Sequence, residues 1–143
     1  LGLPRLEIDV ILGQASPWID KARAKLPLGG HNARIVSNPP DMAGIMAGAD
    51  AAIIAAGVTA LEAAYMRLPF ALCVLADNQE PQAEVLAKQG LAPLLPWQDP
   101  DRTVAALDTF LNSLDSRQIM PEKGRKLVDG KGASRVCQAL KQA

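Results

Sequence analysis

Residues 51–79, AAIIAAGVTALEAAYMRLPFALCVLADNQ, contain two apolar runs that each end in a short polar group. The first run, 51–56, is followed by Gly-Val-Thr and then by a single glutamate, Glu62. The second run, 70–76, is followed by Asp-Asn-Gln at 77–79. Short apolar runs bounded by such breaks are typical of buried strands. The stretch therefore predicts a strand, a helix and a second strand.

The rest of the chain continues this alternation of strands and helices. Further strands are expected at LEIDVIL, ARIVS and LAPLLP (6–12, 33–37 and 91–96). Helices are expected at 16–26 with Ser16 as N-cap, 41–49, 80–90, from Asp99-Pro100 onward, and 133–142, with a polar stretch around Gly124 before the last. Because the strands are apolar along their whole length, both faces of the sheet should be covered. We predict an α/β fold, a Rossmann-like parallel sheet of about five strands with helices on both faces.

Composition narrows the classes of function. A chain of 143 residues fits a single domain, 1–143. Its fifteen basic and fifteen acidic residues cancel, which argues against nucleic acid or an anionic membrane as a partner. No apolar run reaches the roughly 18 to 20 residues of a membrane span, and no signal peptide is visible. The chain begins at Leu1 rather than Met, which suggests a fragment.

Motifs for metals and common cofactors are missing from the sequence. Cys73 and Cys137 lie far apart, outside any Cys-x-x-Cys or His-rich spacing, so we expect reduced structural thiols in a cytoplasmic protein and no metal site. No G-x-G-x-x-G or Walker spacing occurs, which leaves NAD, ATP and other cofactors without support. Trp18 and Trp97 are interpreted as packing residues.

The loop after the first apolar run has two interpretations. Thr59 as N-cap and Glu62 three residues later would form a capping box, which needs no ligand. Alternatively, the amides of Gly57, Val58 and Thr59 face a phosphate at the positive end of a helix. Glu62 would then accept hydrogen bonds from a ribose diol. Both interpretations require the same carboxylate.

The loop after the second run has a similar arrangement. Asp77 can cap a helix with Glu80 at the box position. Capping leaves Asn78 and Gln79 unexplained, and their side chains carry the paired donors and acceptors that suit hydroxyls or a diphosphate. In a parallel sheet both loops lie at the carboxyl edge, where ligands of this fold class bind.

Together, MAGIMAGADAAIIAAGVTALEAAYMRLPFALCVLADNQ and the later LVDGKGASRV resemble the carboxyl-terminal half of a glycosyltransferase-B enzyme. The nearest families are the UDP-sugar hydrolases of pseudaminic acid biosynthesis and the predicted glycosyltransferases of spore-coat polysaccharide synthesis. The resemblance implies a UDP-sugar ligand, with Glu62 on the ribose, 57–59 facing the diphosphate, and Asn78 and Gln79 on the sugar or phosphates. It places the stretch from Asn38 to Met42 near the base.

The chain departs from that family in two ways. Its relatives usually carry Gly-Gly-Ser-Thr where this chain has Ala-Gly-Val-Thr, so Val58 replaces a hydroxyl-bearing residue. The family's first strand and its amino-terminal acceptor domain, which supplies a catalytic histidine in the hydrolases, have no counterpart here. We therefore expect no catalytic residue and no turnover by this chain alone.

With the family strand order 3-2-1-4-5-6, loss of strand 1 would split the sheet. The alternatives are that strand 2 pairs with strand 4, that another chain fills the gap, as in a homodimer, or that the sheet rearranges. For function, a non-catalytic binding or assembly module without nucleotide binding remains the alternative to a UDP-sugar-binding half. An epimerase of related fold would need further catalytic groups.

Overall fold

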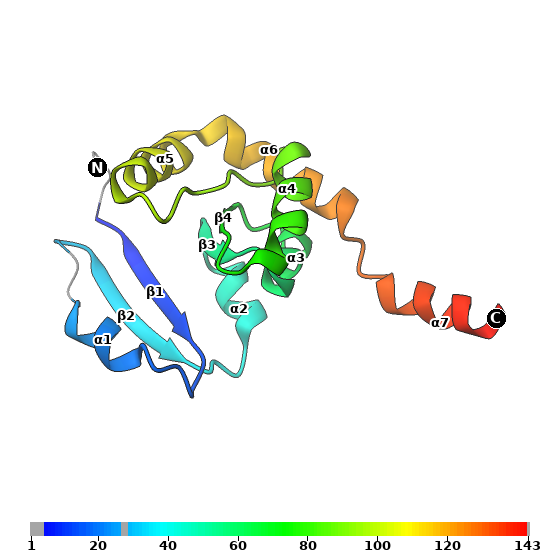
Figure 1. Cartoon of the computed structure of the whole chain (residues 1–143), viewed down its shortest axis with the longest axis horizontal. Coiled ribbons are helices and arrows are strands. Elements are labelled where there is room, and N and C mark those ends of the chain that lie inside the picture. The colour runs from blue at the N-terminus through cyan, green and yellow to red at the C-terminus, as the bar shows by residue number, and fades with distance from the viewer. Residues whose placement is uncertain (1–4, 27–28, 143) are drawn as a thin grey trace. The chain divides into compact units, whose positions relative to one another are not determined.

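The computed structural model describes residues 5–26 and 29–142. The chain divides into two compact units, Leu1–Met42 and Ala43–Ala143. The first unit contains the strand β1 (Glu7–Leu12), the helix α1 (Ile19–Ala24) and the strand β2 (Asn32–Ser37) (Figure 1). After α2 (Met42–Ala47), which begins at the boundary, the second unit contains β3 (Ala52–Ala55), α3 (Val58–Tyr65), β4 (Phe70–Cys73), the 3₁₀ turn η1 (Asp77–Gln79), α4 (Glu80–Lys88), α5 (Pro100–Asn112), α6 (Leu114–Leu127) and α7 (Gly132–Gln142).

The first unit is a parallel strand pair joined by α1. β1 and β2 are in register from Glu7 opposite Asn32 to Leu12 opposite Ser37. The helix begins later than predicted, because its N-cap is Trp18, and the Ser16 hydroxyl instead accepts a hydrogen bond from the Trp18 amide at 3.3 Å. Ser16 therefore closes a turn that precedes the helix.

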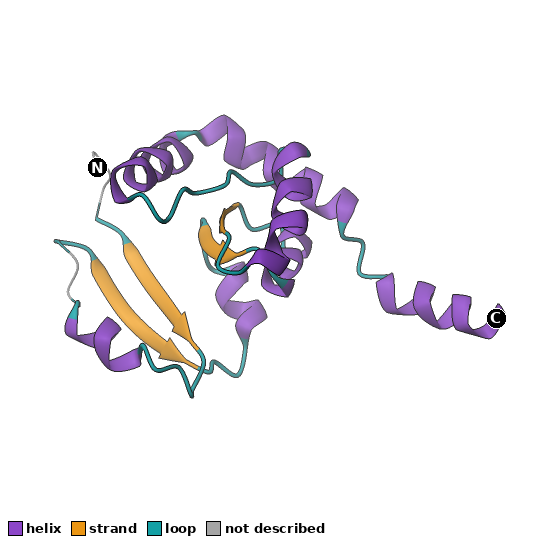
Figure 2. Ribbon diagram, viewed as in Figure 1, coloured by secondary structure: helices purple, strands orange, loops and turns teal. Residues whose placement is uncertain are grey.

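The second unit is built on another parallel pair. β3 and β4 are in register from Ala52 opposite Phe70 to Ala55 opposite Cys73 (Figure 2). On the edge of β4 that faces away from β3, Leu72 forms a single parallel bridge with Leu94. The Leu72 amide there donates a hydrogen bond to the Pro93 carbonyl at 2.9 Å. β4 therefore has a neighbour on each of its two edges.

The prediction of one five-stranded sheet is wrong in its strand count, whereas the parallel α/β character is confirmed. The described strands form two separate two-stranded sheets, β1 with β2 and β3 with β4. The predicted strand at 91–96 is reduced to one bridge, and Pro93, which faces β4, has no amide hydrogen with which to extend the ladder. The prediction of a single domain for 1–143 stays a prediction.

The core of the second unit surrounds β4. Its largest fully buried side chains are Phe70, Leu72, Leu86 and Leu91. Because side chains alternate along a strand, Ala71 points to the other face, where it packs with Leu95, Phe110 and Met120. β4 is thus covered on both faces, as the continuous apolar pattern predicted.

The polar stretch predicted around Gly124 is in fact part of the helix α6, which also contains Pro121. Gly124 is buried against α3: a Cβ atom at this position would lie 2.7 Å from the Ala64 carbonyl oxygen. Gly124, whose low helix propensity favoured a break, therefore lies within a helix and allows α6 to approach α3 closely. Tertiary packing outweighs the low helix propensity of glycine here.

Arg67 adopts a left-handed backbone conformation at the end of α3, with φ of 62°. The Leu68 amide donates to the Ala63 carbonyl at 3.0 Å and the Arg67 amide to the Ala64 carbonyl at 3.3 Å, which is the Schellman pattern that usually ends in glycine. We expect Arg67→Gly to raise the free energy of unfolding by about 0.5 to 1 kcal/mol, because glycine enters this region without steric cost.

Urea denaturation of the second unit measures this effect, and Arg67→Ala is the matched control. Alanine removes the same side chain but retains a Cβ atom, so it should give no such gain. Equal stabilities of the glycine and alanine variants would contradict the strain at this position.

Candidate functional site

The loops after β3 and β4 lie side by side at one edge of the second unit. The two strands are parallel and in register to their last residues, and the Ala56 amide donates to the Cys73 carbonyl at 3.0 Å. Across this edge, the Gln82 side chain of α4 donates from Nε2 to the Gly57 carbonyl oxygen at 2.8 Å. The polar groups that the sequence placed at a common edge are therefore adjacent, and Gln82 ties α4 to the first loop.

The capping-box interpretation of the first loop is wrong. α3 begins at Val58 with Gly57 as N-cap, and no side chain caps it. Thr59 therefore lies inside the first turn, and Glu62 lies one position beyond this turn, so the reciprocal geometry of a capping box cannot form. Glu62 is exposed, and its carboxylate makes no hydrogen bond or ion pair to the residues that the structure describes.

The predicted amide donors of this loop differ from one another. The Gly57 amide donates to the Ala55 carbonyl at 2.8 Å, so it is already satisfied. The amides of Val58 and Thr59 have no acceptor within 5–26 or 29–142, as expected for the first turn of a helix. The Val58 side chain is 73% exposed and points away from the core. Two of the three amides remain available to a ligand.

The second loop is also formed differently from the prediction. Its first element is the turn η1 with Ala76 as N-cap, and α4 begins only after it, so Asp77 caps neither. The Gln79 side chain accepts a hydrogen bond from the Leu75 amide at 3.0 Å. Gln79 therefore shapes the loop, whereas Asn78 is exposed and its side chain has no partner in the described part of the chain.

Asn38 and Met42 belong to the first unit. Asn38 follows β2 in a left-handed conformation with φ of 46°, which asparagine tolerates, and its amide donates to the Leu12 carbonyl at 3.0 Å. Met42 is the first residue of α2. Their predicted place near a nucleotide base stays a prediction.

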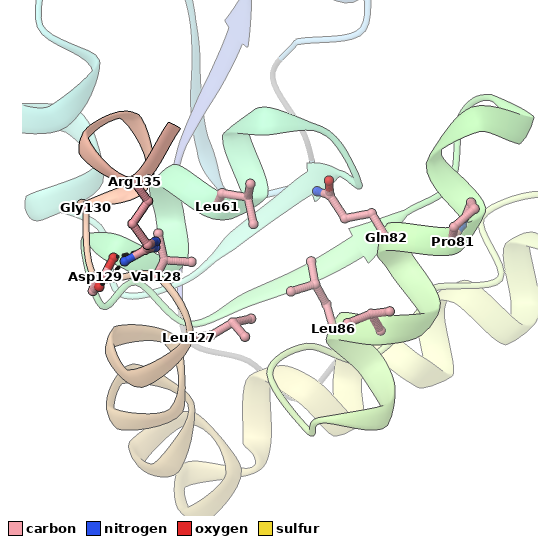
Figure 3. A pocket seen from close by; sticks show the side chains of 11 residues that line it. Leu61, Pro81, Gln82, Leu86, Leu127, Val128, Asp129, Gly130 and Arg135 are labelled. Carbon is pink, nitrogen blue, oxygen red and sulfur yellow. Dashed lines mark hydrogen bonds and ion pairs between the residues drawn. The ribbon is translucent and has the colours of Figure 1, made fainter. Parts of the chain in front are cut away.

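An apolar groove of about 650 Å³ lies beside Gln82 (Figure 3). Its walls come from α3, α4, the end of α6 and the start of α7, including Leu61, Val85, Leu86, Leu127 and Arg135. None of the eight residues predicted to bind a nucleotide-sugar lines this groove.

The motif LVDGKGASRV forms one rim of that groove. Asp129 accepts hydrogen bonds from Arg135 at 2.7 and 3.1 Å and from the Lys131 amide at 2.9 Å. The Arg135 guanidinium, followed by that amide, holds the pKa of Asp129 well below its usual range. Gly130 has φ of 75° and approaches the Tyr65 ring so closely that a Cβ atom would lie 2.8 Å from it. The motif therefore fixes the connection from α6 to α7, a role that the sequence alone did not reveal.

Sequence reasoning also missed two residues at the carboxyl edge. Gln82 was treated only as part of the predicted helix 80–90. Its contact with the Gly57 carbonyl leaves no pattern in the local sequence. Trp97 was interpreted as a packing residue, but the residue is 44% exposed and its Nε1 donates to the Val74 carbonyl. A tryptophan directly after an interrupted strand is the signal that could have drawn attention to it.

The described residues contain neither a metal-binding cluster nor a helix suited to a membrane. No group of three or more His, Cys, Asp or Glu side chains in 5–26 and 29–142 could hold a metal ion. Within the same ranges, no helix combines the length and the apolar character required to cross a membrane.

Parallel strands joined by helices, with polar loops at the carboxyl edge, define an α/β domain of the class that binds ligands at that edge. The crystal structure described as that of the glycotransferase of kitacinnamycin has the same fold, with a TM-score of 0.64 and 18% identity over 99% of this chain and 43% of that one. No protein-family model matches the chain.

A curated relative indicates which kind of α/β protein this chain resembles. The spore coat polysaccharide biosynthesis protein SpsG of Bacillus subtilis (strain 168) is 32% identical over 133 residues, which cover 91% of this chain and 39% of SpsG. These two similarities support a glycosyltransferase-like domain of the GT-B type, and the predicted resemblance is confirmed. It spans about two fifths of each of these two proteins.

Proposed function

We propose that the chain binds a UDP-sugar at the carboxyl edge of β3 and β4. It would be the nucleotide-sugar-binding part of a glycosyltransferase, or of a UDP-sugar hydrolase, that acts in bacterial surface polysaccharide or nonulosonic acid biosynthesis. The observation that carries the proposal is the exposed carboxylate of Glu62 on a helix whose Val58 and Thr59 amides are free; neither this carboxylate nor these two amides have a partner among the described residues. The buried residues Ala60, Ala63 and Ala64 hold this helix against the core.

Each part of the ligand has a candidate partner. A carboxylate that accepts two hydrogen bonds suits the vicinal hydroxyls of ribose. The amides of Val58 and Thr59 lie at the positive end of α3 and suit a diphosphate. Asn78, exposed on the adjacent loop, suits sugar hydroxyls, and Gln79 retains its amide nitrogen as a donor. These groups favour a sugar nucleotide over a simple anion.

The same groups have a role in catalysis by a complete enzyme. Breaking the bond between sugar and UDP places negative charge on the leaving diphosphate. Preorganised amides at a helix terminus stabilise that charge without reorganising. No general base is assigned to this chain, so we expect it to bind without turnover.

The role of Glu62 is tested by Glu62→Ala in titration calorimetry with UDP. We expect affinity for UDP to fall about 10- to 100-fold, because hydrogen bonds to a charged group contribute about 1.5 to 3 kcal/mol. The free energy of unfolding should change by less than about 0.5 kcal/mol, since the carboxylate supports no other contact. Glu122→Ala, an exposed glutamate of α6, is the matched control.

The alternative function, a binding or assembly module without nucleotide binding, is favoured by one observation. The Gly57 amide is turned back to Ala55 and cannot serve a phosphate. This alternative predicts no heat from the unsubstituted chain at millimolar UDP. A loss of stability in Glu62→Ala without a loss of affinity would also contradict the ribose role.

A further inference from the structure

Trp97 follows a segment that lies on the outer edge of β4. The Cys73 carbonyl accepts from Ala56 on the β3 side, whereas Leu72 exchanges its hydrogen bonds with Pro93 and Leu95 on the opposite side. The carboxyl edge therefore carries three segments in spatial order: Gly57 with the start of α3, then residues 74–79, then the loop that contains Trp97. This order follows from strand pairing alone.

The indole of Trp97 is fixed and partly exposed. Its Nε1 donates to the Val74 carbonyl, which belongs to the neighbouring loop. The next residue, Leu75, donates its amide to Gln79, so the indole is tied to the loop that also carries Asn78. Just before Trp97 in the sequence, the Pro96 carbonyl accepts a hydrogen bond from the Thr103 hydroxyl at 2.7 Å. Just after it, the Asp99 side chain caps α5 by accepting a hydrogen bond from the Arg102 amide at 3.1 Å. The backbone on both sides of the ring is therefore held in place.

Because Nε1, the only polar atom of the indole, already has a partner, the exposed part of the ring offers only an aromatic surface. The face of an aromatic ring carries partial negative charge. It attracts the weakly positive C–H groups on the flat side of a pyranose. Asn78 on the adjacent loop can meanwhile form hydrogen bonds with the hydroxyls at the edge of the same sugar.

We propose that Trp97 is the stacking surface for the sugar ring of the bound nucleotide-sugar and thereby contributes to sugar specificity. The inference rests on the proposed function. With the ribose on Glu62 and the diphosphate on the amides of α3, both on the β3 side, the group beyond the diphosphate extends past Asn78 toward Trp97. The order of the three segments therefore assigns this ring to the sugar rather than to the base.

The test compares UDP with UDP-N-acetylglucosamine in titration calorimetry of the full chain. For Trp97→Ala we expect affinity for UDP-N-acetylglucosamine to fall about tenfold, while affinity for UDP stays within twofold. Trp97→Phe keeps an aromatic face and should retain most of the affinity for the sugar nucleotide, although it loses the hydrogen bond to Val74. Trp18→Ala, which removes the exposed tryptophan of the first unit, is the matched control.

Each outcome decides one question. Unchanged affinity of Trp97→Ala for both ligands, or an equal loss for both, would overturn the role of Trp97 and leave UDP binding intact. Absence of binding of either ligand by the unsubstituted chain would overturn the proposed function and this inference with it. A loss in Trp97→Phe as large as that in Trp97→Ala would assign the effect to the hydrogen bond and thus overturn stacking.

Discussion

Replacing Phe70 by alanine is expected to lower the free energy of unfolding of the second unit by about 4 kcal/mol. Phe70 is 1% exposed and is the largest of the fully buried side chains on β4. Since β4 is covered on both faces, its neighbours cannot collapse far into the space that the ring leaves. The loss combines the transfer of the ring to water with the cost of a cavity.

Urea denaturation followed by the fluorescence of Trp97 measures this loss in a Trp18→Phe background, because Trp18 belongs to the other unit. Ile53→Ala is the matched control. Ile53 lies on the adjacent strand but is 53% exposed, so its truncation should cost less than about 1 kcal/mol. Similar losses from the two substitutions would show that β4 is not the centre of the core.

The strands that decide the fold were predictable because their signal is local. The apolar runs at 6–12, 33–37, 51–56 and 70–76 correspond to β1 to β4, within a few residues at each end. The predicted fifth strand is only a single bridge, and Pro93 within it has no amide hydrogen to extend the ladder. Strand pairing depends on which partners are available in space, and this is why the number of strands per sheet was wrong.

The candidate site was predictable in its location but less so in its contacts. The edge position of Glu62 and Asn78 follows from parallel strands, whereas the exact start of each helix depends on which backbone groups are satisfied. The helix α3 begins two residues earlier than predicted, with Gly57 rather than Thr59 as N-cap, which removes the capping box and leaves Glu62 without a partner among the described residues. The contact of Gln82 with Gly57 joins residues 25 positions apart and has no sequence pattern.

The packing of α3 against α6 was likewise not predictable from local sequence. The sequence predicted a polar stretch around Gly124 that separates two helices. In the structure the glycine is the contact point for α3, whose buried face is made of the small residues Ala60, Ala63 and Ala64. Small side chains on both helices allow their backbones to meet, a pairing that becomes visible only when the two segments lie together.

Gly124→Val is therefore expected to lower the free energy of unfolding of the second unit by about 3 kcal/mol. A Cβ atom at position 124 would lie 2.7 Å from the Ala64 carbonyl oxygen and 3.1 Å from its Cα atom. Backbone atoms cannot rotate away as a flexible side chain would, so the two helices must separate. Valine also has a higher helix propensity than glycine, so any loss must come from packing.

Gly132→Val is the control for Gly124→Val, because Gly132 also lies in a helix but has no atom within 4 Å of a Cβ position. It should change the free energy of unfolding by less than about 1 kcal/mol in the same urea titration. A Gly124→Val variant as stable as its control would contradict the close approach of α3 and α6. Because the first turn of α3 carries the unpartnered amides and Glu62 lies just beyond it, separation of these helices should also weaken UDP binding, whereas Gly132→Val should leave it unchanged.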